Sequence, residues 1–156
     1  MPMTKQRLDI PLKLKSVSDN GEFEGYGSVF GVKDSYDDVV VPGAFSKSLD
    51  AWREKKSLPA MLWQHQMDEP IGVYTDMKED DVGLYVKGRL LIDDDPLAKR
   101  AYAHMKAGSL TGLSIGYMLK DWEYDRTKEV FLLKEIDLWE VSPVTFPSND
   151  EARISD

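Results

Sequence analysis

Short runs in which apolar and polar residues alternate, each followed by turn-forming residues, constrain the fold of this chain most strongly. Residues 8–14 alternate in this way, the turn sequence DNG follows at 19–21, and the alternation resumes over 23–30. A period of two is typical of a strand with one buried face, and an Asn-Gly turn joins antiparallel strands. The first thirty residues are therefore predicted to form a β-hairpin.

Further strands are predicted from runs rich in β-branched and aromatic residues, at 39–41, 59–66, 71–77, 83–92, 113–124 and 129–140. Turn-forming residues at 79–81 and 125–128 join the last four of these runs into two more hairpins. Most of the predicted strands are thus antiparallel to a neighbour in the sequence.

Two segments have helical rather than strand-like spacing. Apolar residues recur every three or four positions over 44–55, which predicts a short amphipathic helix. A second helix begins near Asp95, where an acidic cap precedes Pro96, and it ends at Gly108. About seven or eight strands with two helices predict a β-rich α+β fold, a mainly antiparallel closed or partly open β-barrel with the helices outside.

Composition bounds the number of domains and the setting of the protein. A chain of 156 residues, 42% of them hydrophobic, has room for one domain over 1–156, with loose ends expected at about 1–5 and 148–156. The sequence has no cysteine, which excludes disulfides and thiolate nucleophiles and fits a reducing cytoplasm. No apolar run approaches the roughly 18–20 residues that span a bilayer, and the N-terminus lacks a signal-peptide core. We therefore expect a soluble, unexported protein without a membrane partner.

The charge disfavours nucleic acid as a partner. Twenty basic and 28 acidic side chains give a formal net charge of -8 at pH 7. A phosphate backbone is repelled by such a chain unless basic residues gather locally, and acidic residues are interspersed throughout after residue 18. We expect no nucleic-acid binding.

Only two histidines are available as a general base. His65 lies where an apolar run gives way to polar residues, at the predicted end of a strand, so a sheet would hold it rigidly within reach of a substrate. The alternative is a half-buried histidine whose ring bonds a carbonyl. His104 is predicted to lie on the exposed face of the second helix, near its C-terminus, where the helix dipole favours a cation.

Ser114 is the candidate nucleophile. The small residues Gly112 and Gly116 flank it, and they would let a substrate backbone approach its hydroxyl. Small residues in a strand also mark tight packing or a bend in a barrel, so periodicity leaves both interpretations open. Residues 112–116 match Gly-x-Ser-x-Gly, but a nucleophile elbow needs a helix after the serine and a strand is predicted here. An α/β-hydrolase is therefore disfavoured.

Glu140 is the third informative residue. It continues an apolar row formed by Ile136 and Leu138, at a position where another apolar residue would be expected. A buried carboxylate needs a partner, and a histidine N–H is one such partner. The bond would fix the tautomer of the imidazole and stabilise the imidazolium. The alternative is an exposed glutamate at a strand end, paired with a lysine.

No metal site or cofactor is expected. The acidic run 93–95 fits helix capping better than a calcium loop. His65 with Asp68 and Glu69 lacks both the His-Glu-x-x-His pattern and a third strong ligand. A metal hydrolase is thus the weakest of the function classes considered.

Six segments, in order, resemble the prohead (capsid maturation) proteases of tailed bacteriophages, the Hong Kong 97 type. They lie between about Gly25 and Asn149 and read GYGSVFG, VVVPGAF, LWQHQMDEPIGVY, EDDVGLYVKGRL, GLSIGY and DLWEVSPVTFPSN. The family is related in fold to the herpesvirus assembly protease, a β-barrel surrounded by helices. The resemblance therefore implies a herpesvirus-assemblin-like barrel.

The resemblance also implies roles for particular residues. It implies a serine endopeptidase with Ser114 as nucleophile and His65 as general base. The herpesvirus relatives use a second histidine as third member, whereas the phage family looks different there and Glu140 is the best match. His104 is the alternative for that role, although its predicted helical, solvated setting argues against it.

Family resemblance implies the substrates and the location as well. The expected substrates are the scaffolding segment of the major capsid protein and the protease itself, cleaved inside the assembling prohead in the host cytoplasm, with a homodimer possible. Related chains often extend beyond the barrel, so the end at Asp156 is compatible with a processed form. The alternative from a non-enzyme class is a capsid-assembly or scaffolding module in which Ser114 is only a packing residue.

Overall fold

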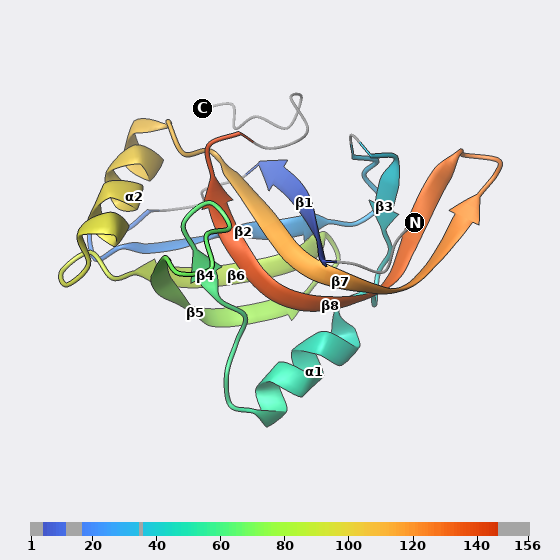
Figure 1. The fold of residues 1–156 in the computed structure, drawn as a ribbon, viewed down its shortest axis with the longest axis horizontal. Coiled ribbons are helices and arrows are strands. Elements are labelled where there is room, and N and C mark those ends of the chain that lie inside the picture. Colours follow the sequence, from blue (N-terminus) through green and yellow to red (C-terminus); the bar gives the residue numbers. More distant parts are fainter. Residues whose placement is uncertain (1–4, 12–16, 35, 147–156) are drawn as a thin grey trace.

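The structure of this chain, a computed structural model, describes residues 5–11, 17–34 and 36–146. Its elements (Figure 1) are β1 (Lys5–Pro11), β2 (Glu22–Val29), β3 (Asp38–Val40), α1 (Ser46–Glu54), β4 (Met61–Leu62), β5 (Pro70–Glu79), β6 (Gly83–Leu90), α2 (Pro96–Ala107), β7 (Gly112–Asp125) and β8 (Val130–Val144). The expected loose ends lie outside the described residues, except Lys5, at which β1 begins. None of the described helices is long and apolar enough to cross a membrane.

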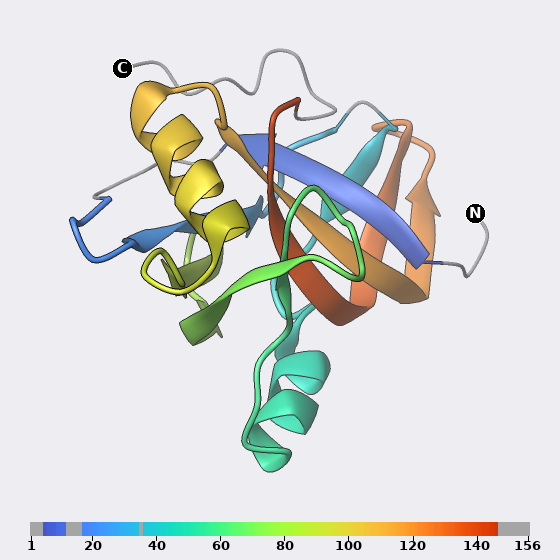
Figure 2. The same ribbon diagram turned by 60° about the vertical axis from the view of Figure 1, so that its left-hand side comes forward.

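The strands form two four-stranded sheets, in the orders β1-β7-β8-β3 and β2-β6-β5-β4. Every strand pair in them is antiparallel except β3 with β8, which is parallel. The long strands β7 and β8 curve across the molecule, and both helices lie outside the sheets (Figures 1 and 2). The predicted β-rich fold with two helices is confirmed, with a curled, half-barrel sheet.

Near its C-terminal end, strand β8 is bonded to residues of the other sheet and of the segment that leads into it. Ala60, just before β4, donates its N–H to the Trp139 carbonyl at 3.2 Å and accepts from the Val141 N–H at 2.9 Å. From the same sheet as β4, the Tyr74 hydroxyl of β5 donates to the Val141 carbonyl at 2.6 Å. These bonds fix the backbone on both sides of Glu140.

Helix α1 also packs on β8. The indole N–H of Trp52 donates to the Leu138 carbonyl at 2.8 Å, and the Ser48 hydroxyl accepts from the Leu138 N–H at 2.8 Å. The backbone two residues before Glu140 is therefore anchored by a helix.

The first predicted hairpin is wrong in its pairing. Strand β1 pairs with β7, with Leu8 opposite Ile115, while β2 pairs with β6. The turn itself is present, with Gly21 at φ 87° and a single bridge between Val17 and Phe23. Alternation specifies which face of a strand is buried but not which strand lies beside it, so the partner of β1 could not be deduced from the pattern.

The two other predicted hairpins and both predicted helices agree with the structure. The hairpins β5–β6 and β7–β8 are present, and α1 lies within the predicted 44–55. Helix α2 has the predicted ends: the Asp95 carboxylate accepts from the Leu97 N–H at 3.0 Å, and Gly108 closes the helix at φ 82°.

Candidate active site

His65 lies in a tight turn after β4 rather than on a strand. The predicted strand over 59–66 is therefore too long, because regular pairing covers only Met61–Leu62. Gln64 and His65 have φ values of 50° and 64°, and the Gln66 N–H donates to the Trp63 carbonyl at 2.9 Å. Two left-handed residues at the centre of a turn closed by such a hydrogen bond form a type I′-like turn. This conformation costs energy for residues other than glycine. The residues of 59–66 favour a strand, so the sequence pattern did not predict this turn.

The side chain of Gln64 ties this turn to the end of β8. Its amide N–H donates to the Thr145 hydroxyl at 2.9 Å, and its amide oxygen accepts from the Thr145 N–H at 3.1 Å. Both ends of one planar amide are thus satisfied by one residue. This double contact offsets the strain of the left-handed backbone and sets the position from which His65 projects.

The register of β7 and β8 brings the other candidates together. Ser114 lies opposite Ser142, and Gly116 lies opposite Glu140. Residues two apart on a strand share a face, so the side chains of Ser114, Ser142 and Glu140 point to the same side of the sheet. All three residues are buried.

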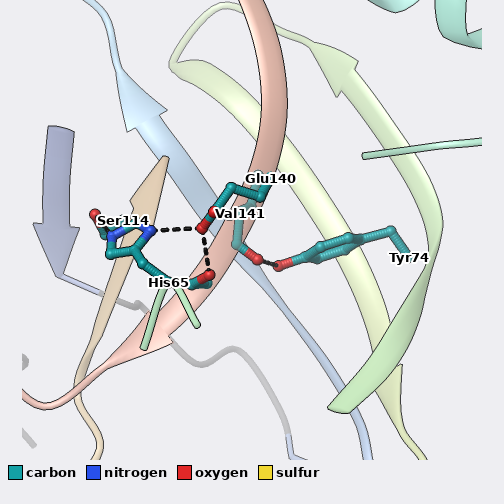
Figure 3. Close-up of polar contacts among 6 residues, drawn as sticks. His65, Tyr74, Ser114, Glu140 and Val141 are labelled. Atoms are coloured by element: carbon teal, nitrogen blue, oxygen red, sulfur yellow. Dashed lines mark hydrogen bonds and ion pairs between the residues drawn. The ribbon is translucent and has the colours of Figure 1, made fainter. Parts of the chain in front are cut away.

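The imidazole of His65 lies between the hydroxyl of Ser114 and the carboxylate of Glu140 (Figure 3). Its Nδ1 is 2.5 Å from Glu140 Oε1, and its Nε2 is 2.5 Å from Ser114 Oγ. A carboxylate only accepts, so Nδ1 carries the proton and Nε2 is left to accept from the Ser114 hydroxyl. The His65 and Glu140 side chains are only 6% and 2% exposed, so little water competes for these bonds.

Glu140 has a further donor that the sequence did not reveal. The Ser142 hydroxyl donates to the same Oε1 at 2.6 Å. The alternation that indicated Glu140 also places Ser142 on the same face, two residues further along the strand. This alternation was the sequence signal that could have pointed to Ser142. Burial, and to a smaller extent the charge of Glu140, raise the pKa of Tyr74 well above its usual value, so that its hydroxyl stays a donor.

Gly116 makes room for the carboxylate. A Cβ at this position would come within 2.5 Å of Glu140 Cγ and 2.7 Å of Glu140 Cδ. The predicted substrate-contact role of Gly112 and Gly116 stays a prediction, but the lack of a side chain at Gly116 has this additional reason. Gly112 lies at the start of β7, opposite Val144.

His104 is apart from this constellation. It is exposed on α2, as predicted, and its Nδ1 lies 2.6 Å from the hydroxyl of Ser109. No group of three or more His, Cys, Asp or Glu side chains within the described ranges is arranged to hold a metal ion.

Two surface pockets adjoin the segment that leads to His65. The larger, about 520 Å³, is lined by apolar residues that include Pro59 and Met61, with Arg53 and Lys56 adding positive charge. The smaller, about 210 Å³, is lined by residues that include Gln64. An extended peptide could therefore find apolar and polar contacts close to the turn.

A serine, a histidine and a carboxylate in one hydrogen-bonded chain form the arrangement found in serine hydrolases. The sequence matches the family model described as Caudovirus prohead serine protease over residues 10–156, and the chain belongs to this family. The predicted family resemblance is thereby confirmed.

Two similar proteins are both named prohead protease. The chain is 35% identical to the prohead protease of Enterobacteria phage HK97 over 92% of its own length, and 30% identical to that of Escherichia phage T5 over 72%. It spans 63% and 52% of those two relatives' lengths. A third match, 36% identical over 60% of this chain and 15% of the relative, is a capsid polyprotein of Pseudomonas phage PAJU2.

A solved structure is similar in fold. The bacteriophage T4 capsid assembly protease superimposes with a TM-score of 0.68, covering 90% of this chain and 98% of that chain at 13% identity. At that identity, the likeness concerns the fold alone.

Proposed function

We propose that this chain is a serine endopeptidase of phage capsid maturation. The observation that carries the proposal is the buried chain from Ser114 through His65 to Glu140, with both imidazole nitrogens 2.5 Å from their partners. Family membership supports the same activity. The expected substrates are the scaffolding segment of the major capsid protein and the protease itself.

In the proposed mechanism, His65 Nε2 removes the hydroxyl proton as Ser114 Oγ attacks a peptide carbonyl. Glu140 holds Nδ1–H and stabilises the imidazolium that forms. Backbone N–H groups hold the oxyanion, and His65 then protonates the leaving amine. A water molecule, deprotonated by His65, hydrolyses the acyl-enzyme and restores the Ser114 hydroxyl.

Substrate access requires a movement in this mechanism. Ser114 has no exposed surface in the structure, and its hydroxyl is bonded to the His65 ring. A peptide carbonyl must reach Oγ, so the segments around the serine have to separate before attack. Binding of a peptide beside the His65 turn would supply the energy for this change.

The capsid setting is part of the proposal. A relative named capsid polyprotein supports a capsid protein as the partner. We propose that the protease acts inside the assembling prohead in the host cytoplasm, as a single domain over 1–156 and with a homodimer as the candidate assembly. We also propose that its curled sheet is a barrel of the herpesvirus-assemblin kind, which an experimental structure of the protein would test.

The test is co-expression with the major capsid protein of the same phage, followed by mass spectrometry of the capsid protein. The wild type should remove a terminal segment at a defined bond, and Ser114→Ala should leave the capsid protein intact. Ser109→Ala is the matched control, because Ser109 is also bonded to a histidine, and it should cleave normally. Cleavage that persists in Ser114→Ala would overturn the serine mechanism.

A fluorophosphonate probe separates the enzyme from a scaffolding module. The probe should label Ser114 in assembled, maturation-competent particles, and Ser114→Ala particles should stay unlabelled. An absence of labelling in wild-type particles would favour the non-catalytic module.

A further inference from the structure

We infer that Ser142 is a positioning residue, whose hydroxyl fixes the carboxylate of Glu140 in the orientation that His65 needs. The inference rests on the proposed function, since it assigns a role within the proposed triad. It concerns a residue that does not touch the reacting atoms and acts through Glu140.

The contact that carries the inference is short and directional. Ser142 Oγ lies 2.6 Å from Glu140 Oε1, and a hydroxyl facing a carboxylate must donate. His65 Nδ1 lies 2.5 Å from the same oxygen. One carboxylate oxygen therefore receives two donors, and their directions together define the plane of the carboxylate.

The backbone places Ser142 with little freedom. It follows Glu140 by two positions on β8, and it lies directly opposite Ser114 on β7. The N–H of the intervening Val141 donates to the Ala60 carbonyl, and the Val141 carbonyl accepts from the Tyr74 hydroxyl. A donor on so fixed a strand keeps its direction.

Burial explains why the carboxylate needs this donor. Glu140 is 1% exposed, so water cannot solvate its charge, and a buried carboxylate is costly unless hydrogen bonds replace that water. On the β7 side the carboxylate faces Gly116, which has no side chain to hold it. The orientation of the carboxylate then depends on its donors, and Ser142 is a donor that does not take part in proton transfer.

The matched control is another buried serine. Ser28 on β2 is also fully buried, and within the described residues its hydroxyl has no hydrogen-bond partner. Ser28→Ala and Ser142→Ala therefore make the same chemical change at equal burial, and only the second removes a donor from Glu140.

The first measurement is the steady-state kinetics of peptide cleavage as a function of pH. Ser142→Ala should lower kcat by about ten-fold with little change in KM, as loss of an orienting hydrogen bond does. The donor favours the deprotonated His65–Glu140 pair, so its loss should raise the apparent pKa of the pair. The acid limb of kcat/KM should therefore move to higher pH, while Ser28→Ala should leave it in place.

The second measurement does not need activity. In the Ser114→Ala background, NMR titration of the His65 ring reports the apparent pKa of the His65–Glu140 pair directly. Adding Ser142→Ala should raise that pKa, and Ser142→Thr should keep the original value because it retains the hydroxyl. Ser142→Val, which has nearly the shape of threonine without the hydroxyl, should behave like alanine.

The outcomes separate this inference from the proposed function. An unchanged titration in both Ser142→Ala and Ser142→Val would overturn the role of Ser142, whatever the protease assay shows. A raised pKa that threonine prevents supports that role, even if the cleavage assays fail and the proposed protease function falls. If the alanine variant does not fold, the threonine and valine variants distinguish the same two outcomes.

Discussion

Two His–Ser hydrogen bonds of nearly equal length occur among the described residues, one in the β7–β8 region and one at the end of α2. His65 Nε2 is 2.5 Å from Ser114 Oγ, and His104 Nδ1 is 2.6 Å from Ser109 Oγ. Distance does not distinguish the two pairs. Their surroundings do, because the first pair is buried and bonded to a carboxylate, whereas the second is exposed.

The direction of each bond follows from its neighbours. Ser109 Oγ also lies 3.2 Å from the carbonyl of His104, so its proton is given to that carbonyl and its oxygen accepts from the ring. In the other pair, Glu140 takes Nδ1–H and leaves Nε2 as an acceptor. The ring nitrogen therefore accepts from the serine hydroxyl in one region, whereas in the other the ring donates to the serine and the pair only caps a helix end.

The largest effect should come from removing the Ser114 hydroxyl. Ser114→Ala should reduce kcat by about 10⁴-fold or more, because a triad acts as a unit and loses nearly all its rate with any one member. Ser109→Ala should leave kcat within about two-fold, since its hydroxyl serves a local contact. Peptide cleavage rates for both variants provide the measurement, and equal losses would refute the distinction between the pairs.

Replacing the carboxylate should have the next largest effect. Glu140→Gln should reduce kcat by about 10³- to 10⁴-fold, because an amide can stabilise the wrong imidazole tautomer and cannot balance an imidazolium. The exposed pair of Glu135 with Lys47 offers a control, and Glu135→Gln should keep activity. If His104→Ala were the slow variant and Glu140→Gln the normal one, the third role would move to His104.

Filling the space under the carboxylate should weaken the site without removing any functional group. Gly116→Ala places a Cβ against Glu140, so kcat should fall by about 100-fold through displacement of the carboxylate. The free energy of unfolding should fall by about 1–3 kcal/mol. At Gly27, by contrast, a Cβ would meet only side-chain atoms at 3.3 Å or more, so Gly27→Ala should keep activity. Cleavage kinetics and chemical denaturation measure both effects.

Loosening the His65 turn should have a smaller effect. Gln64→Ala removes both amide bonds to Thr145 and should lower kcat by about ten-fold, since the imidazole is then held less firmly. The free energy of unfolding should fall by about 1–2 kcal/mol. The neighbouring Gln66 is exposed, and Gln66→Ala should match the wild type in both assays. Normal kinetics in Gln64→Ala would mean that the turn does not depend on this clamp.

The smallest effect concerns a buried carboxylate with fewer donors than Glu140. Burial, with the neighbouring Asp34 and Asp37 charges, raises the pKa of Asp38 from 3.8 to about 7. The folded chain then holds this proton more tightly than the unfolded chain, so the stability that it contributes is present below pH 3.8 and is lost as pH rises through 7. Asp38→Asn should raise Tm at pH 8 by about 2–4 °C. A thermal scan at pH 5 should show a smaller gain, and an equal gain at both pH values would contradict the prediction.

Much of the fold could be predicted because it depends on local patterns. The hairpins β5–β6 and β7–β8 follow from alternation and turn residues, and α2 follows from its caps at Asp95 and Gly108. The candidate residues could also be named in advance. A serine between glycines, one histidine at the end of an apolar run and one glutamate in an apolar row were each unusual for their position.

Only the tertiary structure decided how these parts meet. The pairing of β1 with β7 and the space that Gly116 leaves for Glu140 join segments that are distant in sequence, and the left-handed turn at His65 is tied to Thr145 through Gln64. The role inferred for Ser142 also depends on the tertiary structure. It rests on one hydrogen bond to the Glu140 carboxylate and on the register that places Ser142 opposite Ser114. Periodicity determines which face of a strand is buried, whereas the register between strands and the geometry of a turn determine which buried groups touch.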